Sequence, residues 1–326
     1  MGEMRIDVFF TSDDRKKSLM RDVEHGLTSR PKTLLPKYFY DAVGSELFEQ
    51  ITELPEYYLT RTESQLLSSV ARTTISRVCP EEVIELGSGS STKAKVVLEP
   101  AYATGRLSSY VPFDVSESAL TMAAEELTQE YPSLNVHGIV GDFETDLDKI
   151  PQPNGRRLLL LLGSTIGNLN ADSRHKFLVA MRAILGPEDA LLLGVDLVKS
   201  VDMLHAAYND KLGITAAFNR NILAVLNREL GANFNPDEFQ HYAFYNPSSA
   251  RVEMHLIPYV KQIVAIESLC LSIEIQPNES IWTESSYKFT RESTVTMLET
   301  AGFSLKDWST DSDEQVGLVL ATLQQR

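Results

Sequence analysis

Short apolar runs alternate with longer amphipathic stretches between residues 80 and 200. The apolar runs are mostly unbroken, which is typical of parallel strands that are covered on both faces. We predict strands over 83–86, 108–115, 135–140, 157–163 and 190–198, and helices near 91–103, 116–130 and 171–185. Strand, helix and strand repeated at this spacing predict a Rossmann-like, doubly wound α/β fold.

The pattern stops over 199–290 and resumes afterwards with a helix, RESTVTMLETAGF, that Gly302 is expected to end. Two strands, SLKDWST and VGLVLATLQ, then close the chain. The interrupting segment contains stretches whose pattern predicts helices and others whose alternation predicts strands. We therefore expect an inserted α+β lobe. Residues 1–75 have a pattern typical of helices and are expected to belong to that lobe. The predicted division is therefore 1–75 and 199–290 for the lobe, and 76–198 and 291–326 for the sheet domain.

The charge balance narrows the choice of partners. The 326 residues include 45 Asp and Glu against 30 Lys and Arg, which gives a net charge of −15. Such a surface repels nucleic acid and anionic membranes, so we expect neither as a partner. Two widely separated cysteines indicate a reducing compartment, and no signal peptide or membrane-spanning run is apparent. We expect a cytoplasmic, soluble, monomeric protein that binds a small ligand.

The stretch VIELGSGSSTKAK (83–95) places Gly87 and Gly89 where the first strand meets its helix. It matches neither the GxxxxGK[ST] phosphate loop nor the full GxGxxG dinucleotide signature. Alone, it is equally consistent with a tight turn between strand and helix.

Acidic residues at the ends of the next strands change this picture. Asp114 ends YVPFDV, where a carboxylate can accept both hydroxyls of a ribose. In the following GDF, Asp142 can accept from an adenine amino group while Phe143 packs on the ring. With Glu85 after the first strand, this arrangement favours S-adenosylmethionine as the cofactor, and NAD is the alternative.

The fourth strand leads into GSTIGNL (163–169). The carboxamide of Asn168 can accept a hydrogen bond from a substrate amine without carrying a charge that competes for the proton. The simpler alternative is that Asn168 only shapes the loop.

Several longer blocks carry a family resemblance. The sequence resembles the L-histidine Nα-methyltransferases of ergothioneine biosynthesis, which make hercynine, in KYFYDAVGSELFEQITELPEYY (37–58), IELGSGSSTK (84–93), GDFE (141–144), GSTIGNL (163–169), AAFNRN (216–221), RVEM (251–254) and ESSYKF (284–289). These blocks run through almost the whole chain. One departure is Leu59, where the family pattern has proline after the paired tyrosines.

The resemblance implies a class I methyltransferase domain, a substrate lobe and no metal. It assigns the cofactor to Gly87, Lys93, Asp114, Asp142 and Phe143. It assigns the amino-acid end of L-histidine to Tyr40, Asn168 and Tyr208, with Tyr40 and Asn168 as the catalytic pair. It assigns the imidazole to Tyr57, Glu284 and Ser286, with Met254 against the ring. For Tyr40 and Tyr57, packing in the core or rim is the alternative.

The implied reaction requires only a neutral amine in line with the methyl group of a sulfonium. Catalysis would then depend mainly on positioning and desolvation. The six histidines show no metal-ligand spacing, and no Ser/His/Asp arrangement is apparent. Two alternatives stay open, namely a methyltransferase for another aromatic amino acid (tryptophan or tyrosine) and a regulatory module that binds the cofactor without turnover.

Overall fold

The computed structural model describes residues 2–89, 91–153 and 155–324, and the chain forms two compact units. Unit 1 comprises Met1–Thr11, Arg61–Leu197 and Phe289–Arg326. Unit 2 comprises Ser12–Thr60 and Val198–Lys288.

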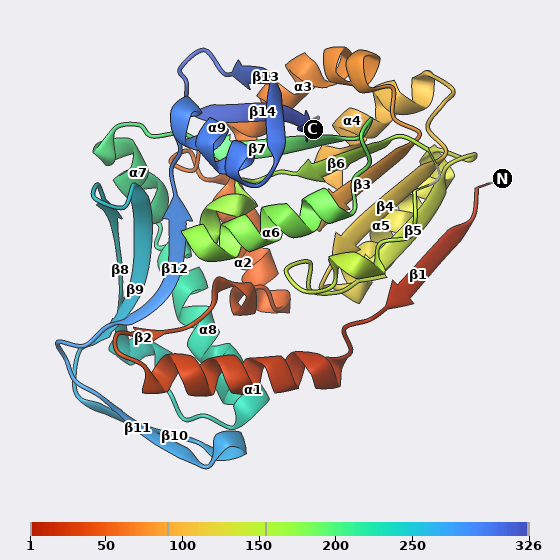
Figure 1. Cartoon of the computed structure of the whole chain (residues 1–326). Helices are drawn as coiled ribbons and strands as arrows, with labels where there is room; N and C mark the ends of the chain where they lie inside the picture. The colour runs from red at the N-terminus through yellow and green to blue at the C-terminus, as the bar shows by residue number, and fades with distance from the viewer. Residues whose placement is uncertain (1, 90, 154, 325–326) are drawn as a thin grey trace. The chain divides into compact units, whose positions relative to one another are not determined.

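Unit 1 is built on an eight-stranded sheet with the order β1-β5-β4-β3-β6-β7-β14-β13 (Figure 1). The strands are β1 (Met4–Val8), β3 (Glu82–Leu86), β4 (Ser109–Asp114), β5 (Asn135–Val140), β6 (Arg157–Leu161), β7 (Ala190–Asp196), β13 (Phe303–Thr310) and β14 (Val316–Leu323). The first six in the sheet are parallel, whereas β14 and β13 are added antiparallel. The order reverses between β3 and β6, which confirms a doubly wound sheet.

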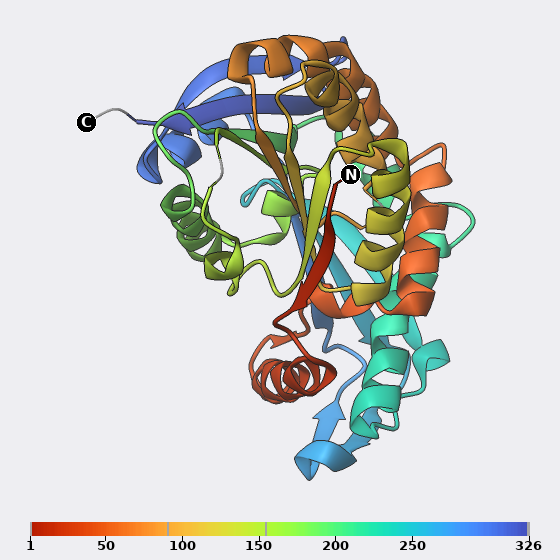
Figure 2. The same ribbon diagram turned by 90° about the vertical axis from the view of Figure 1, so that its right-hand side faces the viewer.

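Helices cover both faces of this sheet. They are α3 (Leu59–Val78), α4 (Thr92–Ala103), α5 (Glu117–Glu130), α6 (Ala171–Ala183) and α9 (Arg291–Thr300), with short 3-10 helices η2 (Leu147–Lys149) and η3 (Thr165–Asn168). Figure 2 shows α5 on one face and α6 with α9 on the other. Every residue of β3, β6 and β7 is buried as a result, which explains why these strands are mostly apolar and do not alternate. Gly302, at φ 85°, follows the end of α9 as predicted.

The N-terminal segment differs from the prediction that 1–75 is a helical part of the lobe. Residues Met4–Val8 form a strand that pairs in parallel with β5, and α3 contributes to unit 1 from Arg61 onward. The strand β1 was missed because it lies at the edge of the sheet and is held by backbone hydrogen bonds. Its side chains are partly exposed and need no apolar run. The later boundaries lie at 198 and 288 rather than 199 and 290.

Unit 2 contains helices and strands, as expected for the inserted lobe. Its helices are α1 (Ser12–Thr28), α2 (Ala42–Glu53), α7 (Val201–Tyr208) and α8 (Ile214–Leu230), with η1 (Pro36–Phe39), η4 (Pro236–Glu238) and η5 (Glu267–Leu269). A four-stranded sheet has the order β2-β12-β9-β8, formed by β2 (Lys32–Thr33), β12 (Ile281–Tyr287), β9 (Arg251–Pro258) and β8 (Phe239–Asn246). A separate hairpin pairs β10 (Gln262–Ile266) with β11 (Leu271–Ile275).

The two faces of the four-stranded sheet differ in character. On β9, Val252, Met254 and Leu256 are buried and form the inner face, which packs against α8. The alternate positions carry Arg251, Glu253 and His255 on the outer face.

None of the helices in the described part of the chain is long and apolar enough to cross a membrane.

Candidate functional site

The loop after β3 turns on two glycines at the carboxyl edge of the sheet. Gly87 and Gly89 have φ values of 72° and 48°, a region that favours glycine. The Gly87 N–H donates to the Phe113 carbonyl over 2.8 Å, which fixes the loop to β4. A Cβ on Gly87 would lie 3.6 Å from the Phe143 ring, whereas a Cβ on Gly89 would meet no atom within 4 Å. The backbone at Gly89 therefore borders open space that a ligand can approach.

Asp114 lies at the end of β4, beside this loop. Its carboxylate accepts hydrogen bonds from the N–H groups of Gly89 at 2.9 Å and Ser116 at 3.0 Å. Burial raises the pKa of the Asp114 carboxyl, and the backbone hydrogen bonds act in the opposite direction. The side chain is still partly exposed. The carboxyl edge of the sheet thus holds, at the end of β4, an oriented carboxylate that can accept further hydrogen bonds.

Asp142 and Phe143 follow β5. The Asp142 carboxylate accepts from the Glu144 N–H over 3.0 Å and is nearly buried. Phe143 reaches back to Gly87 and also packs at 5.6 Å, between ring centroids, against Phe177. The loops after β3 and β5 therefore converge, and the cofactor candidates Gly87 and Phe143 lie in contact distance of each other.

Glu85 lies within β3, in agreement with the strand predicted over 83–86, and not after the strand as the cofactor arrangement assumed. It is buried and accepts a hydrogen bond from the Tyr110 hydroxyl over 2.6 Å. The same hydroxyl lies 3.0 Å from the Ser91 Oγ. Burial raises the pKa of Glu85 to about 8. This acid fixes the base of the glycine loop from inside the sheet.

Lys93 contacts a carboxylate that was not among the predicted site residues. Its Nζ lies 2.5 Å from Oε2 of Glu63, a fully buried residue of α3. Glu63 also accepts from the Gly163 N–H, with distances of 2.7 and 2.9 Å to its two oxygens. A Cβ at Gly194 would lie 2.1 Å from Glu63 Oε1, so the glycine on β7 makes room for this carboxylate. Glu63 thereby joins the first turn of α4 to the loop after β6.

Asn168 is the last residue of η3, in the loop that begins at Gly163. Ser164, at φ 54°, turns the chain there, and its Oγ accepts from the Asp196 N–H over 3.0 Å. The Asn168 carboxamide is partly exposed and has no hydrogen-bond partner within the described ranges. In unit 1, the carboxyl ends of β3, β4, β5 and β6, with the loops and the first turn of α4 that follow them, carry all the cofactor candidates and Asn168.

In unit 2, Tyr40 and Tyr57 both contact Phe48. The ring centroids of Tyr40 and Phe48 are 5.5 Å apart, and those of Phe48 and Tyr57 are 6.3 Å apart, both edge to face. Tyr40 also lies 5.6 Å from Phe218. Both tyrosines are partly exposed, so this group of rings forms a partly open aromatic surface rather than a closed core.

A β-bulge decides which way Glu284 faces. The pairing of β12 with β9 joins Trp282 to His255 and then Glu284 to Met254, which leaves Thr283 as the extra residue. In a regular strand, Trp282 and Glu284 would share a face, because side chains alternate with a period of two. The bulge instead leaves Trp282 beside His255 on the outer face and turns Glu284 to the inner face beside Met254.

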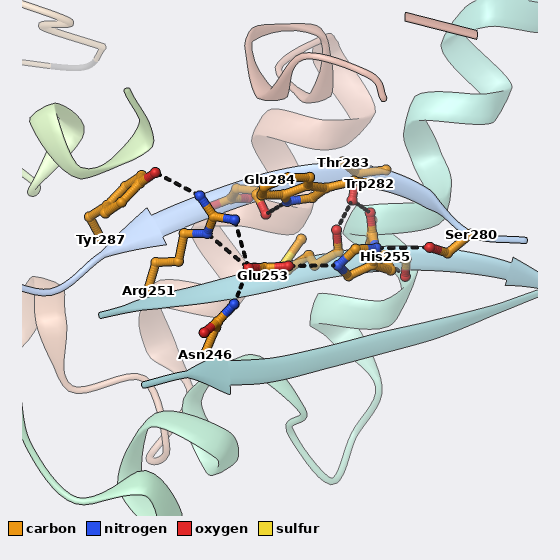
Figure 3. Close-up of polar contacts among 11 residues, drawn as sticks. Asn246, Arg251, Glu253, His255, Ser280, Trp282, Thr283, Glu284 and Tyr287 are labelled. Atoms are coloured by element: carbon orange, nitrogen blue, oxygen red, sulfur yellow. Dashed lines mark hydrogen bonds and ion pairs between the residues drawn. The ribbon is translucent and has the colours of Figure 1, made fainter. Parts of the chain in front are cut away.

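Three hydrogen bonds hold the bulge (Figure 3). The Trp282 Nε1–H donates to the Glu284 carbonyl over 2.8 Å. The Thr283 hydroxyl lies 2.6 Å from Asn219 Oδ1 and 3.1 Å from the Met254 carbonyl. Asn219 is fully buried, so AAFNRN, which contains it, has a structural role in placing Glu284.

An outer cluster, defined as Arg251, Glu253, His255 and Trp282, backs the bulge. Arg251 donates to Glu253 over 2.8 Å and stacks at 4.3 Å on the Trp282 ring. His255 stacks on Trp282 at 5.8 Å, and its Nε2 lies 3.3 Å from Glu253. Burial lowers the pKa of His255. This cluster gives a structural reason for the residue types in RVEM (251–254). Its charged residues lie on the outer face, while Met254 lies on the inner face.

On the inner side, Glu284 remains an acceptor without a donor. No described residue donates a hydrogen bond to its carboxylate, although the side chain is only partly exposed. Desolvation raises the pKa of Glu284 to about 7, and the positive charge of Lys288 acts in the opposite direction. An N–H group of a ligand would satisfy this carboxylate and favour its ionised form.

Tyr208 and Ser286 are brought together directly. The Tyr208 hydroxyl donates to Ser286 Oγ over 2.7 Å, and both residues are buried. Lys288, which was not among the predicted site residues, lies within 2.7 Å of Ser286 Oγ and 3.1 Å of the Tyr208 hydroxyl. The alternation of Glu284, Ser286 and Lys288 could have drawn attention to it.

No group of three or more His, Cys, Asp or Glu side chains suited to a metal ion occurs in the described part of the chain.

Comparison with known proteins agrees with these observations. The model of a family described as histidine-specific methyltransferase, SAM-dependent, matches residues 19–323. The chain is 45% identical to the histidine N-alpha-methyltransferase of Mycolicibacterium smegmatis, over 96% of this chain and 97% of that protein. It is 30% identical to ergothioneine biosynthesis protein 1 of Schizosaccharomyces pombe, over 92% of this chain and 39% of that protein. It is 27% identical to 4-dimethylallyltryptophan N-methyltransferase easF of Claviceps purpurea, over 85% and 87% of the two chains. The protein belongs to the histidine-specific, SAM-dependent methyltransferase family.

Proposed function

We propose that this protein transfers methyl groups from S-adenosylmethionine to the α-amine of L-histidine three times, yielding hercynine, the first step of ergothioneine biosynthesis. The observation that carries the choice of histidine is the placement of Glu284. A carboxylate that lacks a donor lies beside Met254 and on the same strand as Ser286, which is hydrogen-bonded to Tyr208. Such a set of groups matches an aromatic ring that has nitrogen atoms.

The groups at the carboxyl edge of the sheet in unit 1 fit S-adenosylmethionine. The Asp114 carboxylate can accept from ribose hydroxyls, the backbone at Gly89 borders open space, and Phe143 offers an aromatic surface. Gly87, Lys93 and Asp142 complete the proposed binding residues. When bound, S-adenosylmethionine supplies an electrophilic methyl group. The protein itself has only to hold and orient the reactants.

The amine is the nucleophile, and it must be neutral to react. The Asn168 carboxamide oxygen can accept a hydrogen bond from the amine, and the Tyr40 hydroxyl is proposed as its second polar partner. Both groups are uncharged, so neither favours the protonated amine. The rings of Tyr40, Tyr57 and Phe48 suit a growing ammonium cation, because cations are attracted to aromatic faces.

The side-chain ring is proposed to lie against Met254, with Glu284 accepting its N–H. Ser286 and Tyr57 are the remaining polar contacts, and Tyr208 contributes to the amino-acid end. In the ionised state Glu284 is the stronger acceptor, so substrate binding is expected to weaken as the pH falls below about 7.

A second candidate is a larger aromatic amino acid, because a relative named for a tryptophan derivative is 27% identical. Glu284 disfavours this alternative. Indole has one N–H at a different place on a larger ring, and a polar site rejects analogues that leave its groups unpaired. We further propose that the protein acts as a monomer in the cytoplasm, without nucleic acid.

Competition tests the substrate assignment. Equimolar histidine, tryptophan and tyrosine are incubated with the protein and S-adenosylmethionine, and the products are counted by mass. The proposal predicts methylated histidine in large excess. Equal methylation of all three would remove the case for a site that recognises imidazole.

A further inference from the structure

Lys288 is a buried lysine whose contacts lie in the proposed substrate site. Only 3% of its surface is exposed, and it follows directly on β12. Its Nζ lies 2.7 Å from Ser286 Oγ, 3.1 Å from the Tyr208 hydroxyl and 5.0 Å from the centroid of the Tyr208 ring. Since Tyr208 and Ser286 are themselves 2.7 Å apart, the three polar groups form a closed triangle.

The ammonium fixes the direction of two of these hydrogen bonds, and the geometry gives the direction of the third. An ammonium can only donate, so both hydroxyl oxygens must accept from Lys288. Tyr208 donates its single hydrogen to Ser286. Ser286 Oγ therefore accepts twice, and its own hydrogen has no acceptor among the described residues. That hydrogen is available to a ligand.

The bulge at Thr283 places this donor on the same side of the strand as the acceptor Glu284. Glu284 pairs with Met254, and Ser286 pairs with Val252, whose side chains both belong to the inner face. One acceptor and one donor thus stand two residues apart on one face. A neutral imidazole is complementary to this pair, because it has one N–H and one nitrogen that accepts.

On the basis of the function proposed above, we propose that Lys288 is a positioning residue that determines specificity. It holds Ser286 as a hydrogen-bond donor, so that the site requires an accepting nitrogen in the substrate ring. Without the ammonium, the Ser286 hydroxyl is free to donate to Tyr208 instead, and the requirement for the ring nitrogen is relaxed. Lys288 acts through Ser286 and Tyr208 and needs no contact with the substrate.

Ring analogues that lack an N–H separate the contact of Ser286 with the accepting ring nitrogen from the contact of Glu284 with the ring N–H. The two thiazolylalanines attached through C4 or C5 keep one accepting nitrogen, in either of the two positions found in histidine. Thienylalanine keeps the ring size and has no nitrogen. Their affinities are measured by calorimetry with S-adenosylhomocysteine present, so that the readout does not depend on turnover.

The parent is expected to bind one thiazolylalanine about tenfold or more tightly than thienylalanine. In Lys288→Met this preference should fall to less than about threefold, while S-adenosylhomocysteine affinity is unchanged. Lys261→Met is the matched control, because it removes the same charge from an exposed ion pair with Glu274 in unit 2, and it should keep the preference. Ser286→Ala should also lose the preference, and Lys288→Met should then have no further effect.

A preference that survives in Lys288→Met overturns the inference, as does a parent without any preference. Additive effects of Lys288→Met and Ser286→Ala would also overturn it, because they would show that Lys288 does not act through Ser286. A different outcome would contradict the proposed function. A parent that discriminates the analogues but does not methylate histidine would contradict the reaction and leave the role of Lys288 intact.

Discussion

The Asp114 carboxylate accepts a hydrogen bond from the Gly89 N–H over 2.9 Å, which ties the end of β4 to the glycine loop after β3. The same carboxylate accepts from Ser116 and remains partly exposed. A single side chain thus shapes the loop and keeps acceptor capacity for a ligand. The cofactor assignment depends on this second property.

Asp114→Ala is expected to weaken the binding of S-adenosylhomocysteine by about 2–3 kcal/mol, because a charge-assisted contact is lost. Titration calorimetry measures this change. Asp148→Ala is the control, since Asp148 is an exposed carboxylate of the same unit. An unchanged affinity, or tight binding of NAD by the parent, would refute the assignment.

The Glu63 carboxylate is expected to contribute to stability through Lys93 and Gly163 together. Glu63→Ala leaves the Gly163 N–H and the Lys93 ammonium without this partner, and should lower the free energy of unfolding by about 2–3 kcal/mol. Denaturant unfolding gives the value. In a Lys93→Met background the loss should be smaller, because the two residues interact directly.

Glu126→Ala is the control for that measurement. It breaks an exposed ion pair with Lys95, and the loss should stay within about 0.5 kcal/mol. Strict additivity of Glu63→Ala and Lys93→Met would show that the short contact between them contributes nothing.

The raised pKa of Glu85 predicts that the stability of the protein depends on pH. Its pKa is raised from 4.5 to about 8 by burial, so the folded protein keeps a proton that the unfolded chain releases. The stabilisation is complete below pH 4.5 and is lost as the pH rises through about 8. Relative to Glu85→Gln, the free energy of unfolding of the parent should fall by up to about 1.4 kcal/mol per pH unit over this range.

Urea unfolding of both proteins at several pH values between these limits checks the sign and the slope. The comparison with Glu85→Gln removes the contribution of other titrating groups. Parallel curves for the parent and the variant would mean that Glu85 is ionised in the folded state.

The bulge in β12 provides a test of how Glu284 is placed. Trp282→Phe keeps a ring for Arg251 and His255 but removes the N–H that donates to the Glu284 carbonyl. The free energy of unfolding should fall by about 1 kcal/mol, and the affinity for histidine should fall by more than that for S-adenosylhomocysteine. Trp308→Phe, at the other tryptophan of the chain, is the control in unit 1. An undiminished affinity for histidine would show that the bulge does not depend on this bond.

The central sheet could be predicted because its inner strands are covered on both faces and therefore consist of mostly apolar, non-alternating runs. The edge strand β1 could not, because its side chains are partly exposed. The cofactor candidates lie at or just after the strand ends, and the positions of Gly87, Asp114 and Phe143 there could be anticipated from the fold class alone.

The remaining site features depend on tertiary contacts. A strict alternation places Trp282 and Glu284 on one face, whereas the Thr283 bulge separates them. Glu63 lies in a mixed polar helix, and only the structure shows that it is fully buried beside Gly194. Substrate roles for Tyr40 and Tyr57 came from the family resemblance, and they stay predictions.

Mass spectrometry of the purified protein incubated with L-histidine and S-adenosylmethionine tests the central claim most directly. We predict successive appearance of monomethyl-, dimethyl- and trimethylhistidine, with the trimethylated product accumulating. Monomethyl- and dimethylhistidine supplied separately should be converted to the same product, and Asn168→Ala should slow every step. A histidine that remains unmodified, or a reaction that stops after one methyl group, would contradict the account.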